Sequence, residues 1–352
     1  MFVSNSKNKF YLVFPLILAG VLGSCASNNT TATSGNNSTG NKTSSLSGSI
    51  SIDGSSTVFP LTEIMSEEFQ NSYPDVRIAI GVSGTGGGFK KFCAGETDIS
   101  NASRPIKPSE AEECAKNSIN FIEIPVAFDA LSVVVHKDND WAYCLTAAEL
   151  KKVWSPGAQG KITNWNQVRD NFPDQPLSLY APGTDSGTFD YFTEAINGDG
   201  GVARGDVTST EDDNVIVQGV SGDLGSLGYF GLAYLEENVD KIHGVNIDNE
   251  DPNDGGDGCV EPTVANVEQG LYQPLARPLF IYVSESALAR AEVQAFANYY
   301  ADEANGDLVA ESGYITFPSP VYTKVKERLE TKKMGSAFLE ISTVGVNLQD
   351  VL

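Results

Sequence analysis

The chain has 352 residues, with 46 acidic and 23 basic side chains and a formal net charge of −23. This length exceeds that of one average domain and predicts two lobes. The acidic charge is spread along the chain and argues against binding nucleic acid or an anionic membrane through a basic patch. It does not exclude a small anion, because a buried site built from N–H and O–H dipoles needs no net positive charge.

Residues 1–24 are typical of a secretory signal peptide. Two lysines precede a short apolar run, Phe10–Leu22, which cannot span a bilayer as a helix. Cys25 follows Leu-Gly-Ser in a pattern that resembles a bacterial lipobox, so we expect cleavage before Cys25 and lipid on its sulfur. The alternative is a plain signal peptide in which Cys25 is incidental. The Ser-, Thr-, Asn- and Gly-rich residues 25–47 then predict a flexible, lipid-anchored linker.

Two junctions near the start of the folded part combine hydroxyls with glycine. A short strand at 50–52 leads into Gly54-Ser55-Ser56-Thr57, after which apolar side chains recur at helical spacing. A second strand at 76–80 leads into Ser83-Gly84-Thr85-Gly86-Gly87-Gly88, again before a helical pattern. Unpaired N–H groups converge at a helix N-terminus, where the helix dipole is positive, so each junction can hold a small oxyanion.

The third such junction is Gly183-Thr184-Asp185-Ser186-Gly187-Thr188, which precedes Phe189, Phe192 and Ile196 at helical spacing. Any one junction is also what an ordinary helix cap or tight turn would contain. Three junctions with clustered hydroxyls together predict that they converge on one anionic ligand.

Alternating strand-like and helix-like segments predict an α/β architecture with mainly parallel sheets. Residues 121–135 form a long β-prone stretch that we expect to cross into a second lobe, and 279–283 form another β run. Thr146 to Glu149 form a capping box that predicts a helix start, whereas 198–215 and 246–262 are rich in Gly and Asp and predict loops. A helix-rich tail would return to the first lobe. We therefore expect lobe I at 48–127 and 280–352, and lobe II at 128–279, with two crossing strands as the hinge.

Four cysteines follow Cys25, and an even count in an exported chain predicts disulfides with three possible pairings. We favour Cys93–Cys114 and Cys144–Cys259, because each pair then lies within one lobe. No metal site or cofactor is expected, since no two cysteines are closely spaced and the chain has only two histidines, His136 and His243.

Enzymatic interpretations find little support. Asp185-Ser186-Gly187-Thr188 matches the signature of aspartic proteases, but these enzymes need two such carboxylates, and the chain has one copy. A serine hydrolase would need a base beside Ser186, and neither histidine lies in a motif that suggests pairing. The glycine-rich turn lacks the Gly-Lys-Ser/Thr ending of a P-loop.

The order of four segments resembles that of periplasmic phosphate-binding proteins of the PstS type, over nearly all of residues 48–352. The segments are Asp53-Gly54-Ser55-Ser56-Thr57, Gly84-Thr85-Gly86-Gly87-Gly88-Phe89-Lys90, Thr97-Asp98-Ile99-Ser100-Asn101-Ala102-Ser103-Arg104 and Asp185-Ser186-Gly187-Thr188. The resemblance implies a type II periplasmic binding protein fold with the ligand in the interlobe cleft. It also implies a protein that is not an enzyme, and we expect a monomer. Such a protein delivers phosphate to the permease of an ABC transporter, in the periplasm or at the cell surface.

Carried over by motif, the phosphate ligands would be Ser56, Thr57, Thr85, Ser186, Gly187 and Thr188. Two positions depart from the family pattern. Ser103 stands where many members have an aspartate that accepts the phosphate proton, and Pro182 stands where they have an arginine. Asp185 or Asp98 would then be the proton acceptor, and Arg104 would supply the charge. The alternative for Arg104 is a surface ion pair, and the alternative for Asp98 is a turn or cap residue. The alternatives are a site for another tetrahedral oxyanion such as sulfate, or a surface or sensing lipoprotein without a transport role.

Overall fold

A computed structural model describes residues 46–184, 186–253, 255–339 and 347–352. Within these residues nine strands form a sheet in the order β2-β1-β3-β11-β4-β8-β6-β7, with β9 beside β4, and β5 pairs with β10. The strands are β1 (Ser47–Gly54), β2 (Asp75–Val82), β3 (Ile99–Ala102), β4 (Phe121–His136), β5 (Cys144–Thr146), β6 (Ser178–Pro182), β7 (Thr208–Thr210), β8 (Ser226–Gly231), β9 (Ile242–Gly244), β10 (Asn246–Asp248) and β11 (Ala276–Ser284). Parallel pairs build the outer part of each lobe, and antiparallel pairs at β4 and β11 join the lobes.

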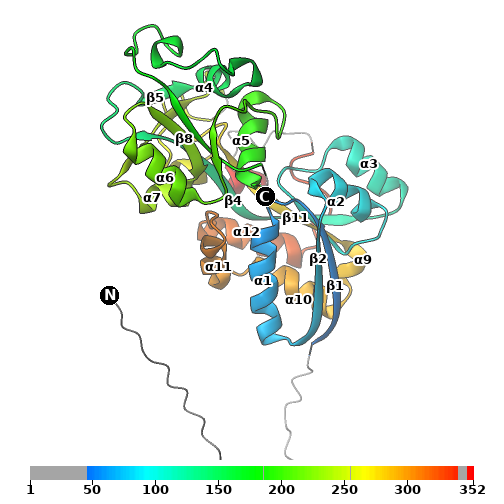
Figure 1. Ribbon diagram of the computed structural model, residues 1–352. Coiled ribbons are helices and arrows are strands. Elements are labelled where there is room, and N and C mark those ends of the chain that lie inside the picture. The colour runs from blue at the N-terminus through cyan, green and yellow to red at the C-terminus, as the bar shows by residue number, and fades with distance from the viewer. Residues whose placement is uncertain (1–45, 185, 254, 340–346) are drawn as a thin grey trace, which may run out of the picture. The chain divides into compact units, whose positions relative to one another are not determined.

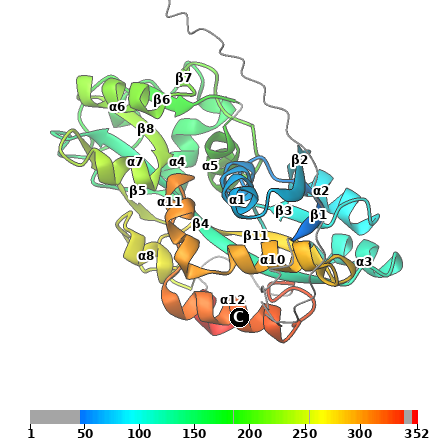
Figure 2. The ribbon, with the colours of Figure 1, turned by 90° about the horizontal axis from the view of Figure 1, so that it is seen from below.

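Helices cover the faces of this sheet, as Figures 1 and 2 show. Those of the first lobe are α1 (Phe59–Ser72), α2 (Gly84–Cys93), α3 (Pro108–Lys116), α9 (Glu285–Leu288), α10 (Ala291–Tyr300), α11 (Gly306–Glu311), α12 (Ser319–Glu330) and α13 (Leu348–Val351). Those of the second lobe are α4 (Ala147–Trp154), α5 (Gly187–Asn197), α6 (Asp213–Gly222), α7 (Leu232–Glu237) and α8 (Val264–Glu268). The tail does return to the first lobe, where the ring of Phe296 in α10 packs 5.1 Å from that of Phe69 in α1.

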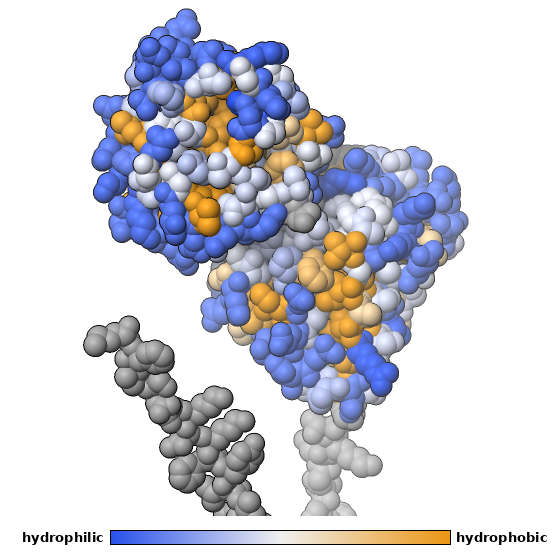
Figure 3. Space-filling view, viewed as in Figure 1, coloured by the Kyte–Doolittle hydropathy of each residue, from blue (hydrophilic) through white to orange (hydrophobic). Residues whose placement is uncertain are grey.

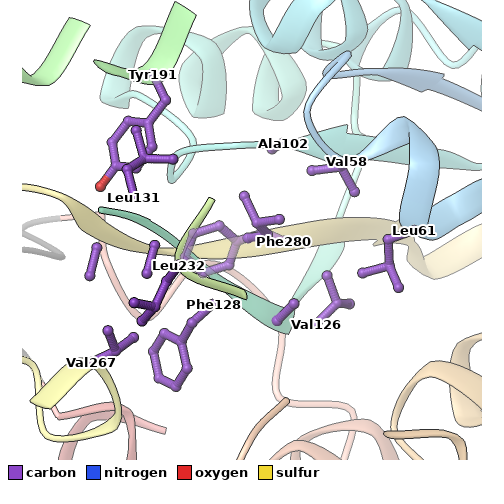
Figure 4. Close-up of a cluster of buried hydrophobic side chains, with 14 of the residues drawn as sticks. Val58, Leu61, Ala102, Val126, Phe128, Leu131, Tyr191, Leu232, Val267 and Phe280 are labelled. Atoms are coloured by element: carbon purple, nitrogen blue, oxygen red, sulfur yellow. The ribbon is translucent and has the colours of Figure 1, made fainter. Parts of the chain in front are cut away.

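Two long strands pass from one lobe to the other. The first part of β4 pairs with β11, whereas its residues 131–135 pair with β8 of the second lobe. The register of β11 against β4 shifts between Leu279 and Phe280, beside the expected lobe boundary at 279/280. Figure 4 shows the apolar core following these strands, with Val126, Phe128 and Leu131 on β4. Both strands are almost entirely buried, as their mainly apolar sequences predict, although Glu123, Asp129 and Arg277 carry charges.

Local sequence signals explain several elements. The predicted capping box at the start of α4 is present, because the Glu149 N–H donates to Thr146 Oγ1 (3.1 Å) and the Thr146 N–H donates to the Glu149 carboxylate (2.9 Å). The prediction of loops is wrong in part, since residues 198–215 include β7 and the first turn of α6, and residues 246–262 include β10. The short β7 exists only through its parallel pairing with β6.

Both favoured disulfides are present. Cys93 at the end of α2 is bonded to Cys114 in α3, and Cys144 in β5 is bonded to Cys259. The first bond fastens α2, which begins at the glycine-rich turn, to its neighbour.

The surface is mostly hydrophilic on the face shown in Figure 3, with separate apolar patches on both lobes. In the described part of the chain, no helix is both long enough and apolar enough to cross a membrane. The expected signal peptide, the lipidation of Cys25 and nearly all of the linker fall outside the described residues, so they stay predictions.

Candidate functional site

A small polar cavity of about 270 Å³ lies where the turn before α1, the start of α2 and helix α5 meet. The first lobe contributes small and hydroxyl-bearing residues: Ser55, Ser56, Thr57, Gly84, Thr85 and Ser103. The second lobe contributes mainly charged and aromatic residues, together with one glycine: Asp190, Tyr191, Glu194, Gly200 and Arg277. A larger hollow of about 360 Å³ between α10 and α12 contains none of the predicted ligand residues. The structure therefore brings the two first-lobe junctions and the helix that follows the third junction to one place, whereas none of the described residues of 183–188 lines the cavity.

The hydroxyls of the first lobe are held by local contacts. Thr85 Oγ1 accepts a hydrogen bond from the Ser103 N–H (3.2 Å) and lies 3.1 Å from Ser103 Oγ. The Ser55 N–H donates to the Asn101 carbonyl of β3 (3.0 Å), which fixes the turn that carries Ser56 and Thr57. Of the predicted site residues in the first lobe, Ser56, Thr57, Thr85 and Ser103 line the cavity.

Helix α2 is pressed closely against β1. A Cβ on Gly88 would lie 2.5 Å from the Gly54 Cα, so this contact requires glycine and explains part of the glycine-rich turn. Asp53 holds both ends of the helix, because its carboxylate accepts from Ser83 Oγ at the N-cap and from Lys91 Nζ (2.5 Å) in the last turn. Burial raises the pKa of Asp53, but the hydrogen bonds from Lys91 and Ser83 outweigh it and leave the pKa lowered. The carboxylate is thus ionised and structural.

The second-lobe turn meets the first lobe at Thr57, as the adjacent ends of α1 and α5 in Figure 2 suggest. A Cβ on Gly187 would lie 2.8 Å from Thr57 Oγ1, so glycine permits this close approach. Ser186 caps α5, with its Oγ accepting from the Thr188 N–H (3.2 Å). Neither Ser186 nor Thr188 is among the residues that line the cavity, and Asp185 falls outside the described residues. Their role as ligands stays a prediction.

Arg277 is the cation of this cavity, and the sequence reasoning missed it. Its Nε lies 3.2 Å from Asp129 Oδ2 on the neighbouring crossing strand, and its Nη1 lies 3.5 Å from Glu194 Oε2. The guanidinium carbon stacks 3.6 Å from the centre of the Tyr191 ring. Arg277 is the single charged residue of β11, and a charge in a buried strand is a signal that could have identified it.

The two residues proposed to replace missing family positions lie elsewhere. Arg104 forms two hydrogen bonds with the Glu110 carboxylate (2.8 and 2.9 Å) and does not line the cavity. Glu110 sits in the first turn of α3, only six residues on, so a local ion pair explains Arg104. Asp98 accepts hydrogen bonds from Ser51 and pairs with Arg290 (2.5 Å), which leaves it no part in the cavity.

Asp190 and Glu194 place two carboxylates on the cavity side of α5. Their spacing of four residues, continuing from Gly187 one turn earlier, puts them on one helical face and could have predicted them. No described residue donates a hydrogen bond to the Asp190 side chain. Although Asp190 is exposed, desolvation raises its pKa, Arg277 partly opposes the rise and Glu194 adds to it.

The enzymatic alternatives gain nothing from the geometry. Neither His136 nor His243 lies at the cavity, and His243 packs against Tyr143 on the far part of the second lobe. Among the described residues no group of His, Cys, Asp and Glu is arranged to hold a metal ion.

Comparison with known proteins places the chain in a family. A model described as a PBP superfamily domain matches residues 31–304. The chain is 50% identical over 303 residues to protein SphX of Synechococcus elongatus, covering 86% of this chain and 88% of that one. It is 36% identical over 286 residues to the phosphate-binding protein PstS of Staphylococcus saprophyticus, covering 80% of this chain and 85% of that one. A crystal structure of a possible phosphate-binding protein from Planctomyces limnophilus matches with a TM-score of 0.77 and 46% identity, covering 82% of this chain and 99% of that one.

Proposed function

The chain belongs to the PstS-type phosphate-binding proteins of the periplasmic binding protein superfamily, and from that membership we propose that it binds inorganic phosphate and delivers it to the permease of a phosphate ABC transporter. Members of this family are substrate-binding components of transporters and not enzymes. The fold is the type II periplasmic binding protein fold.

One observation carries the proposal: hydroxyl-bearing turns at helix starts share a single small cavity with one guanidinium. Helix starts and hydroxyls supply hydrogen-bond donors, and hydrogen bonds to an ion in a dehydrated site are strong. Arg277, held by Asp129 and stacked on Tyr191, adds one positive charge at a fixed place. A dianion of tetrahedral shape has the acceptors that such a set of donors requires.

Phosphate is favoured over sulfate because of Asp190. A carboxylate without a hydrogen-bond donor would repel sulfate, which has only acceptors, whereas hydrogen phosphate can donate its proton to the carboxylate. We therefore assign the role of proton acceptor to Asp190 and not to Asp98, whose carboxylate oxygens bind Ser51 and Arg290. Asp185, two positions before the first residue of α5 in the sequence, remains a second candidate.

The remaining parts of the proposal concern the place of action. We infer that lipid on Cys25 anchors the protein to the membrane, that residues 25–47 form the tether, and that the folded part acts as a monomer in the periplasm or at the cell surface. Mass spectrometry of the mature protein tests this directly, since a diacylated or triacylated Cys25 at the N-terminus is expected. An N-terminus elsewhere without lipid would contradict it.

Calorimetry tests the binding itself. Protein stripped of ligand should bind phosphate with one-to-one stoichiometry and sulfate much more weakly. Equal affinity for the two ions would contradict the role given to Asp190. If neither ion binds, the transport function itself is wrong.

A further inference from the structure

A chain of hydrogen bonds lies in the core of the first lobe. The Glu123 carboxylate of β4 is fully buried and accepts from Tyr282 Oη (2.6 Å), the Ala337 N–H (2.8 Å) and Ser336 Oγ. Tyr282 Oη in turn accepts from the Ile106 N–H (2.8 Å). This chain, which we call the Glu123 relay, connects residues 336–337 to the loop that follows β3.

The C-terminal end of the relay is anchored on β4 by main-chain contacts. The Gly335 N–H donates to the carbonyl of Phe121 (2.7 Å), which lies two residues before Glu123 on the same strand. Arg328 of α12, itself buried, donates to the Glu123 carbonyl (2.8 Å) and to the Gly335 carbonyl (2.6 Å). Residues 335–337 are therefore fixed at the same point of the strand as the Glu123 carboxylate.

The other end of the relay supports two residues of the cavity. Ile106 lies three residues after Ser103, so the hydrogen bond from its N–H holds the loop that carries Ser103. The ring of Tyr282 packs edge-to-face on Phe89 of α2, with the ring centres 4.8 Å apart, and α2 begins beside Thr85. Tyr282 thus contacts both elements that present Thr85 and Ser103, and these two side chains meet at 3.1 Å.

The buried Glu123 carboxylate depends on all its hydrogen-bond partners. Burial raises the pKa of Glu123, and the hydrogen bonds from Ser336, Tyr282 and Ala337 together with the Arg328 charge offset the rise only in part. A buried polar group left without its partner costs the full loss of its hydration, so removal of one member disturbs the others. Tyr282 of β11 and residues 336–337 of the C-terminal segment donate to the Glu123 carboxylate. Arg328 of α12 fixes the same residue through its main-chain carbonyl.

We propose that Glu123 and Tyr282 are positioning residues for the anion site, which set the Ser103 loop and α2 relative to the cavity and tie both to residues 335–337. The inference rests on the proposed function of the cavity. It assigns no contact with the ligand to either residue. Its consequence is that a change at Ser336, far from the ligand along the chain, alters the affinity for phosphate.

A matched pair of variants tests the inference. Tyr282→Phe removes the hydroxyl of the relay, and Tyr300→Phe removes an equally buried hydroxyl of the same lobe, which donates to Thr62 (2.9 Å) away from the cavity. The full chain would be stripped of ligand, its Tm measured and phosphate titrated by calorimetry. We expect both variants to lower the Tm, but only Tyr282→Phe to weaken phosphate binding, by about tenfold. Ser336→Ala should weaken it in the same direction.

A second readout does not depend on phosphate. Hydrogen exchange of the backbone amides at 103–107 should accelerate in Tyr282→Phe and Ser336→Ala, and stay unchanged in Tyr300→Phe. Unchanged exchange at these amides, or equal loss of affinity in both tyrosine variants, would overturn the inference. Absence of phosphate binding in the unsubstituted protein would instead refute the proposed function, with the exchange measurement still deciding on the relay.

Discussion

Arg277 joins the crossing strands to the cavity, so a substitution there has two separable effects. Removing it alone would leave the buried Asp129 without its partner, which typically costs about 3–5 kcal/mol of stability. The double variant Arg277→Gln/Asp129→Asn avoids this unpaired charge. Compared with Asp129→Asn alone, we expect it to bind phosphate about 10- to 100-fold more weakly, as for loss of a charged hydrogen bond. Equal affinities of the two variants in calorimetry would remove Arg277 from the site.

Asp190 offers a test of selectivity at the same scale. Asp190→Asn should raise the ratio of sulfate to phosphate affinity by about tenfold, because the amide can donate to an ion that has only acceptors. Asp240→Asn, an equal change of charge at an exposed position of the second lobe, is the control and should leave the ratio unchanged. The same ratio in both variants would assign proton recognition to another carboxylate.

The raised pKa of Asp190 also predicts a direction for stability. Its pKa in the folded chain lies above the ordinary value, so the ionised form is disfavoured by folding. At low pH the protonated Asp190 therefore contributes to the free energy of unfolding. The ligand-free protein should lose this stabilisation as the pH rises from the ordinary carboxyl range through the raised pKa. Asp190→Asn should flatten that part of the pH profile of Tm, and a steeper profile would contradict the assignment.

The residues that could be predicted are those whose signal is local. Ser56, Thr57 and Thr85 stand directly at helix starts, where hydroxyls and free N–H groups are expected together. Arg277 and Asp129 meet across 148 positions of sequence, and no local pattern connects them. Arg104 was assigned to the site because a charge was missing there, although its partner Glu110 was near in sequence.

At the scale of elements, the same distinction between local and distant signals holds. Strand β4 follows from a long, mainly apolar β-prone stretch, and the start of α4 follows from a capping box. Both signals lie in neighbouring residues. Strand β7 has three residues and depends on β6, which lies 26 or more positions earlier. Short strands stabilised only by a partner escape prediction because pairing, and not propensity, decides them.

The two disulfides should differ in their contribution to stability. Cys93 and Cys114 are separated by 21 positions, and Cys144 and Cys259 by 115. Loop-closure entropy in the unfolded chain then predicts that Cys144→Ser/Cys259→Ser destabilises by about 1.5 kcal/mol more than Cys93→Ser/Cys114→Ser. Denaturant unfolding of both variants measures the difference. A reversed order would indicate that native contacts, and not chain entropy, dominate.

At the scale of the whole molecule, the net charge of −23 opposes the approach of a dianion. Salt screens this long-range repulsion, while the hydrogen bonds inside the cavity are screened much less. We therefore expect the association rate of phosphate in stopped-flow experiments to rise between low and physiological ionic strength. A falling rate would show that a local positive field around Arg277 steers the ligand.

The family and the two-lobed architecture were predictable because the order of several short motifs is specific even where each motif is not. The crossing of β4 and β11 between the lobes was expected from the same order of motifs. The exact lobe boundaries fall within these continuous strands and stay a prediction. The motifs did not predict the second-lobe residues of the cavity. Asp190, Glu194 and Arg277 come together only when α5 packs beside β11.

The most direct test of the account is a crystal structure of the ligand-stripped protein soaked with phosphate. The account predicts one tetrahedral ion in the cavity, bonded to Ser56, Thr57, Thr85 or Ser103 on one side and to Arg277 on the other. An ion bound at Arg104, or an empty cavity in a protein that binds phosphate in solution, would contradict it.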